Sequence, residues 1–152
     1  MKVVKIIYML LLAVCLTGCT NKPPKTTITN ETVGAIWSAT GGEYITFSQT
    51  FTPSEVDHVD YMLYGEELSQ YITRDPKVIQ ELFDAVSAIE IGEETIEVAD
   101  GYGEQFVFYT TAQERYSITF NMKHFELKNQ YYLISKDEAL WNLTQKMEEV
   151  KE

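Results

Sequence analysis

Alternation between apolar and polar residues is the feature that most limits what this chain can fold into. Residues 56–64 and 115–121 both alternate in this way. In the first segment one side carries Val59, Tyr61 and Leu63, and the other carries His58, Asp60 and Met62. A period of two residues places successive side chains on opposite faces of a β-strand. Residues 104–110 are apolar on both sides, which is typical of a central strand.

Several shorter segments predict additional strands. Residues 33–39 and 43–51 flank Thr40-Gly41-Gly42, and glycines supply the positive φ values of a tight hairpin. Residues 68–73 form another candidate strand. A further hairpin is expected from residues 125–127 and 131–134. Residues 92–104, which are acidic and contain three glycines, are expected to form an irregular connection.

Two segments have helical periodicity instead. Asp75-Pro76 predicts a helix start, because aspartate can cap a helix and proline fits its first position. The stripe that follows consists of Val78, Ile79, Leu82, Phe83, Val86 and Ile89. Ser135 to Glu138 resembles a capping box for a terminal helix. Its expected buried side consists of Ala139, Leu140, Leu143, Met147 and Val150, with Trp141 off the stripe.

The order strands, helix, strands, helix predicts an α+β domain. Its antiparallel sheet is expected to have one face covered by the two helices. The chain has 152 residues, enough for one domain with a substantial core.

The first nineteen residues resemble an export signal. Lys2 and Lys5 precede an apolar run over residues 6–16, and Leu16-Thr17-Gly18-Cys19 follows. This pattern is similar to the lipobox of bacterial lipoproteins. The resemblance implies that signal peptidase II cuts between Gly18 and Cys19, and that the thiol of Cys19 carries a diacylglyceryl group.

The length of the apolar run supports this interpretation. About eleven residues span about 16 Å as a helix, roughly half of a hydrocarbon core of about 30 Å. An ordinary secretory leader with a chance cysteine and an uncleaved anchor are the alternatives. The expected organisation is a signal peptide over residues 1–18, a lipidated tether over 19–32 and one globular domain over 33–152.

Net charge and cysteine content limit the classes of partner and of site that the domain could have. The net charge of −11 disfavours binding to nucleic acid, so contact with the membrane is expected only through the lipid on Cys19. Cys15 and Cys19 are the only cysteines, so the domain would have neither a disulfide nor a thiol ligand. The chain loosely resembles small surface lipoproteins of Gram-positive bacteria, which implies a place at the outer face of the cell membrane.

The acidic connection is a candidate calcium site. Glu93, Asp100 and Glu104 could supply carboxylate oxygens, and the glycines could turn backbone carbonyls inward. The spacing does not match an EF-hand loop. The alternative is a solvated acidic loop that keeps the protein soluble.

The two histidines, His58 and His124, are candidate ligands or general bases. Adjacent residues of a strand point to opposite faces, so Asp57 is not expected to share a site with His58, whereas Asp60 can. Two ligands are fewer than a metal site needs, and the surrounding residues favour surface histidines.

Tyrosines form the remaining candidate site. Tyr44, Tyr61, Tyr64 and Tyr71 could present a platform for a carbohydrate or peptide. They could equally belong to a tyrosine-rich β-core. No nucleophile elbow, phosphate loop or zinc spacing is present in the sequence. The sequence therefore favours a non-enzymatic binding module without a cofactor, recognising a protein, peptide or cell-wall component. A calcium-dependent module and a hydrolase without a motif are the alternatives.

Overall fold

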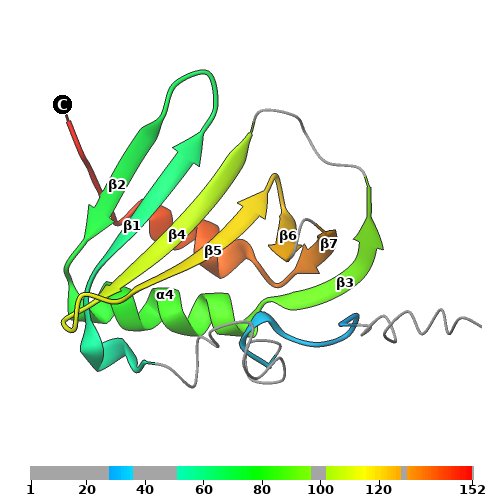
Figure 1. Cartoon of the computed structure of the whole chain (residues 1–152), viewed down its shortest axis with the longest axis horizontal. Coiled ribbons are helices and arrows are strands. Elements are labelled where there is room, and N and C mark those ends of the chain that lie inside the picture. The colour runs from blue at the N-terminus through cyan, green and yellow to red at the C-terminus, as the bar shows by residue number, and fades with distance from the viewer. Residues whose placement is uncertain (1–27, 36–50, 97–101, 128–129, 152) are drawn as a thin grey trace, which may run out of the picture.

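The computed structural model describes residues 28–35, 51–96, 102–127 and 130–151. In these ranges the strands form an eight-stranded sheet in the order β3-β7-β6-β5-β4-β1-β2-β8 (Figure 1). Every pairing is antiparallel. The strands are β1 (Val56–Tyr64), β2 (Ser69–Thr73), β3 (Glu90–Thr95), β4 (Gly103–Thr110), β5 (Arg115–Asn121), β6 (His124–Leu127), β7 (Gln130–Ser135) and β8 (Glu148–Glu149). The antiparallel sheet predicted from the sequence is confirmed.

The centre of the sheet is β4, which pairs with both β1 and β5. Its residues Phe106, Val107 and Phe108 are completely buried, as the apolar pattern on both sides of this segment predicted. Phe106 and Phe108 belong to the main core cluster, whereas Val107 does not, because alternation turns it to the other face. The ring of Tyr61 stacks on Phe106 with centroids 4.8 Å apart. Aromatic packing across neighbouring strands therefore holds the centre of the sheet.

Helix α4 (Pro76–Ala88) begins where the sequence predicted. The Asp75 side chain accepts a hydrogen bond of 2.9 Å from the backbone N–H of Lys77, and Pro76 occupies the first turn. The buried stripe consists of Val78, Ile79, Leu82 and Val86, with Ile89 buried at the C-cap. Phe83 is partly buried and packs edge-on against Phe51, with centroids 5.7 Å apart.

Helix α5 (Glu138–Thr144) is shorter than predicted. Its N-cap is Asp137 rather than Ser135, which is the last residue of β7. Lys136 has a φ of 61°, and this left-handed residue separates the strand from the helix. After Thr144 the chain turns, and Glu148 and Glu149 pair with β2. The predicted inward face fails at Val150, which is 43% exposed, and at Ala139, which is also exposed.

The helices and the sheet share one core. Trp141 of α5 contacts Phe106 and Phe120, with ring centroids 6.0 and 5.4 Å apart. Helix α5 passes behind β4 and β5 in the view of Figure 1. Trp141, which lies off the predicted stripe, therefore packs its ring against the sheet.

The N-terminal part of the described structure differs from the prediction. Residues 33–35 are helical rather than extended. The Oγ1 atom of Thr32 accepts a hydrogen bond of 3.1 Å from the N–H of Ala35, as an N-cap does. The rest of the predicted hairpin, residues 36–50, lies outside the described residues.

The folded part also begins before residue 33. Ile28 is buried in the core, and the N–H of Asn30 donates to the carbonyl oxygen of Ile91 over 2.8 Å. Thr32 forms a bridge to Glu90 of β3. The last residues of the predicted tether therefore pair with the edge strand β3. The small number of apolar residues in this segment gave no indication of this pairing.

The acidic segment after Ile91 is partly regular, in contrast to the expected irregular connection. Strand β3 continues through Gly92 to Thr95 and pairs with β7. A Cβ atom on Gly92 would lie 3.2 Å from the carbonyl oxygen of Leu133, so glycine permits the close approach of the two strands. The 97–101 segment lies outside the described residues.

Candidate functional site

One surface depression of the described structure combines aromatic, acidic and hydroxyl groups. It encloses about 390 Å³ and is lined by Asp57, His58, Tyr109, Thr110, Thr111 and Gln113. Two others lie beside helix α4. One of these is lined by Ile72, Thr73, Arg74, Asp75, Val78, Lys146 and Glu148. The other lies between α4 and α5 and is lined by Glu81, Asp84, Ala85, Ala139, Asn142, Leu143 and Lys146.

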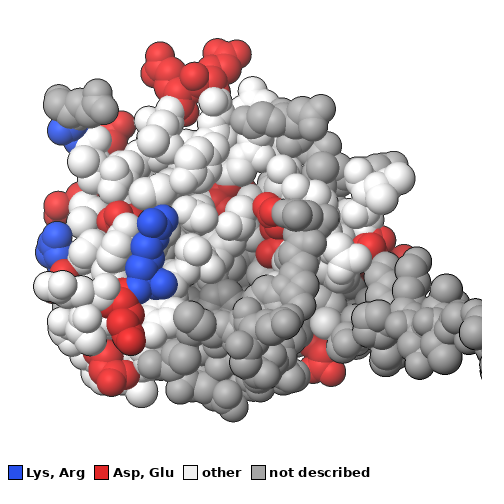
Figure 2. All heavy atoms as spheres, viewed as in Figure 1, with Lys and Arg blue, Asp and Glu red and all other residues white. Residues whose placement is uncertain are grey.

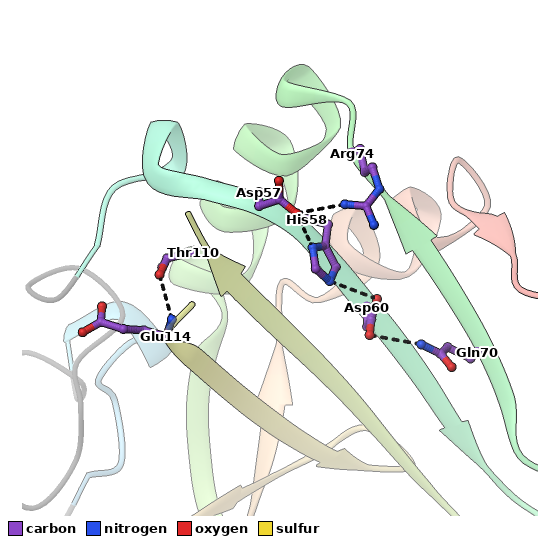
Figure 3. Close-up of polar contacts among 7 residues, drawn as sticks. All are labelled: Asp57, His58, Asp60, Gln70, Arg74, Thr110 and Glu114. Atoms are coloured by element: carbon purple, nitrogen blue, oxygen red, sulfur yellow. Dashed lines mark hydrogen bonds and ion pairs between the residues drawn. The ribbon is translucent and has the colours of Figure 1, made fainter. Parts of the chain in front are cut away.

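A β-bulge at the start of β1 builds the first depression. Val56 pairs with Thr110 and His58 pairs with Tyr109, so Asp57 is an extra residue without a partner on β4. The bulge brings the side chains of Asp57 and His58 together, with 2.6 Å between Oδ2 and Nδ1 (Figure 3). The expectation that these neighbours cannot share a site was wrong, because it assumed regular alternation.

The third member of the cluster is Asp60, two residues further along β1. Asp60 is only 5% exposed, and its neighbours in register are Ile72 of β2 and the buried Val107 of β4. Its Oδ2 accepts a hydrogen bond of 3.1 Å from the side-chain amide of Gln70. Its Oδ1 is buried, has no hydrogen-bond partner among the described residues and lies 4.0 Å from Nε2 of His58.

Arg74 completes this arrangement, which we call the histidine cluster (Asp57, His58, Asp60, Gln70 and Arg74). The guanidinium of Arg74 donates to Oδ2 of Asp57 over 2.9 Å. The hydrogen bond from His58 holds the pKa of Asp57 below its usual value, and the positive charge of Arg74 acts in the same direction. Loss of hydration opposes both effects. Asp57 is therefore an ionised acceptor shared by two donors.

Tyr109 and a tight turn form the other wall of the depression. The rings of His58 and Tyr109 stack with centroids 4.5 Å apart and planes 13° apart. The turn after β4 is closed by the N–H of Glu114, which donates to Oγ1 of Thr110 over 3.1 Å (Figure 3). Gln113 has a φ of 66° in this turn. The ring stack and the closed turn hold the lining residues in fixed positions.

Among the described residues, the contacts of His58 are with carboxylates rather than with a hydroxyl nucleophile. Both ring nitrogens of His58 face carboxylates. A general base that activates a hydroxyl needs one nitrogen within hydrogen-bond reach of that hydroxyl. The described contacts of the ring place Asp57 and Asp60, rather than a serine or threonine hydroxyl, at these nitrogens.

The calcium candidates are not brought together in the described residues. Glu93 is exposed on the edge strand β3, Glu104 lies on β4, and three strands separate β3 from β4 in the sheet order. Asp100 lies outside the described residues. Burial raises the pKa of Glu104, and a backbone hydrogen bond from Met122 opposes the shift. No group of three or more His, Cys, Asp and Glu able to hold a metal ion occurs in the described ranges.

The candidate tyrosines lie on different sides of the sheet. Tyr61 and Tyr71 face the core, with ring centroids 5.7 Å apart, and Tyr61 is buried. Tyr64 is 40% exposed, and its hydroxyl donates to Sδ of Met62 over 3.2 Å. Tyr44 lies outside the described residues. Tyr109, which the sequence did not single out as a site residue, occupies the depression instead.

His124 has a local role at the turn between β5 and β6. Its Nδ1 lies 2.9 Å from the carbonyl oxygen of Asn121. The sequence pointed to His58 and Asp60 as a pair, but Gln70, Arg74 and Tyr109 come from other strands or their ends. No spacing in the sequence signals their approach.

The lipidation candidate Cys19 lies outside the described residues. No family model, no curated protein and no solved structure matches the chain. The functional interpretation therefore depends on the geometry of the cluster and on the sequence pattern of residues 1–19.

Proposed function

We propose that this protein is a lipoprotein that acts as a non-enzymatic binding module at the outer face of the cell membrane. A diacylglyceryl group on Cys19 would tie it to the bilayer, since two acyl chains anchor stably where one is marginal. The basic, apolar and small-residue order of the leader supports this anchor. No helix among the described residues has the length and apolar character needed to cross a membrane.

The domain itself would recognise a peptide, a protein segment or a cell-wall component. Its net charge of −11 disfavours nucleic acid as a partner. Figure 2 shows acidic side chains at the tip of the β1–β2 turn, where Glu66 and Glu67 are exposed. Attachment to anionic headgroups through the folded part is disfavoured for the same reason.

The stacked wall of the depression is the observation that carries the binding proposal. His58 and Tyr109 present an aromatic surface, and Asp57, Thr110, Thr111 and Gln113 surround it with hydrogen-bonding groups. Aromatic planes with a polar rim suit sugars and peptide groups, which combine apolar faces with donors and acceptors. Because the bulge and the closed turn position these residues, a ligand would pay little to order them.

We also infer that α4 and α5 together cover one face of the sheet and leave the histidine cluster on the opposite face. The contacts of Trp141 and Phe83 with core residues support this arrangement. Val107, which is buried outside the main core cluster, and Asp60, its register partner on β1, mark the other face. A ligand could then approach the cluster without displacing a helix.

The test uses full-length protein purified in detergent and probed by NMR with soluble muropeptides and with a mixture of short peptides. A ligand should shift the signals of His58 and Tyr109, and Tyr109→Ala should weaken its binding about tenfold or more, because the stacking wall is lost. His124→Gln is the matched control and should bind as the wild type does. Shifts elsewhere on the surface, with none at Tyr109, would refute this site.

A further inference from the structure

The buried carboxylate of Asp60 is incompletely paired. Its Oδ2 accepts from the amide of Gln70, whereas its buried Oδ1 has no hydrogen-bond partner in the part of the chain that the structure describes. A buried charged oxygen without a donor is costly. The ring of His58 approaches this oxygen, with Nε2 4.0 Å away.

The contact with Asp57 determines which nitrogen of neutral His58 carries the proton. The guanidinium of Arg74 donates to Oδ2 of Asp57 over 2.9 Å, and a carboxylate paired in this way can only accept in the 2.6 Å contact with His58. Nδ1 must then be the N–H donor, and Nε2 of the neutral ring is an acceptor. Two acceptors, Nε2 and Oδ1, therefore face one another across 4.0 Å.

We propose that the histidine cluster is a proton-operated device that regulates the ligand depression. Acidification adds a proton to Nε2 of His58, and the new N–H donates to Oδ1 of Asp60. The ring is then held by a carboxylate at each nitrogen, and its edge moves toward Asp60 to close the gap. The second half of the inference, regulation of ligand binding, depends on the function proposed above.

Carboxylates and one guanidinium surround the ring of His58. On its own strand, the carboxylates of Asp57 and Asp60 both face the ring. Arg74 opposes an added proton, but its charge is already paired with Asp57 at 2.9 Å. From the neighbouring strands, Arg115 pairs with Tyr109 and Glu148 pairs with Ile72, and both charged residues are exposed and therefore screened.

The consequence for the depression is a more rigid and less negative wall. A protonated His58 adds one positive charge beside Asp57, and its two hydrogen bonds fix the ring that stacks on Tyr109. A neutral ligand should therefore bind more tightly when His58 is protonated than when its ring is neutral.

The decisive experiment is NMR of the full-length protein with ¹⁵N-labelled histidine, which needs no ligand. At about pH 5, His58 should show a slowly exchanging Nε2 proton, and Asp60→Asn should speed its exchange about tenfold or abolish the signal. His124 is the internal control and should not respond to the substitution. Should Asp60→Asn disturb the sheet, Asp60→Ser provides a second, smaller replacement.

Two results would overturn the proposal. One is an Nε2 of His58 that stays unprotonated at about pH 5, and the other is an Nε2 proton that exchanges equally fast in the wild type and in both Asp60 variants. Failure of the binding proposal would look different, because the ring would respond to acid while no muropeptide or peptide shifts Tyr109.

Discussion

Replacement of Trp141 by alanine tests whether α5 packs on the sheet. The indole contacts the rings of Phe106 and Phe120, and its Nε1 donates to Oδ2 of Asp137 over 2.5 Å. Loss of a fully buried aromatic ring costs about 3–5 kcal/mol in the free energy of unfolding. Since Trp141 is only partly buried, we expect Trp141→Ala to cost about 2–3 kcal/mol.

Trp141→Phe separates the ring contacts from the hydrogen bond. Phenylalanine keeps most of the contact with Phe106 and Phe120 but has no donor for Asp137, so the expected cost is about 1 kcal/mol. The assay is urea unfolding followed by far-UV circular dichroism, with the m-value checked for a change in cooperativity. The reasoning would be refuted if the alanine variant lost less than about 0.5 kcal/mol, because the ring would then not be part of the core.

Three further predictions concern the cap of α4, the buried Tyr61 and the effect of calcium. Asp75→Ala should destabilise the protein by about 1 kcal/mol in urea unfolding through loss of the α4 cap, and the exposed Asp84→Ala should cost clearly less. Burial, reinforced by the charge of Glu104, raises the pKa of Tyr61 to about 12. The buried neutral hydroxyl of Tyr61 contributes stability that is fully present below about pH 10 and is lost as pH rises through about 12. Tyr61→Phe should therefore lose less stability at alkaline pH than the wild type does. An equal loss in both proteins would contradict the burial of Tyr61. Calcium should leave the melting temperature unchanged relative to chelator, because the described carboxylates are dispersed; a clear rise would instead support the site at Glu93, Asp100 and Glu104.

The sequence predicted correctly those helices and strands that depend on residues close to one another in the chain. The start of α4 at Pro76 depends on Asp75 and on proline geometry, both of which can be read from neighbouring residues. The alternation of β1 and β5 reflects burial of one face, which is also a local pattern.

Features that depend on distant partners could not be predicted in this way. Met147 fits the helical stripe, yet the chain leaves the helix because Glu148 and Glu149 gain backbone hydrogen bonds with β2. Thr32 lies in a polar segment that resembles a tether, but it caps a helical turn and adjoins β3. In both places tertiary pairing overrides the local propensity.

The candidate site, too, could be predicted from the sequence only where its residues lie on the same strand. His58 and Asp60 were identifiable as a pair because they share a face of β1. Asp57 was excluded because the bulge depends on the register between β1 and β4, which one strand alone does not specify. Arg74 and Tyr109 reach the cluster through sheet pairing, so they could be recognised only from the fold.

The proposed anchoring of this binding module is tested most directly by mass spectrometry of the N-terminal peptide from membranes of cells that express the full chain. We predict that the mature protein begins at Cys19 and carries a diacylglyceryl group on its sulfur. Recovery of an unmodified Cys19 still preceded by Gly18, or of the protein free in the culture medium, would contradict this account.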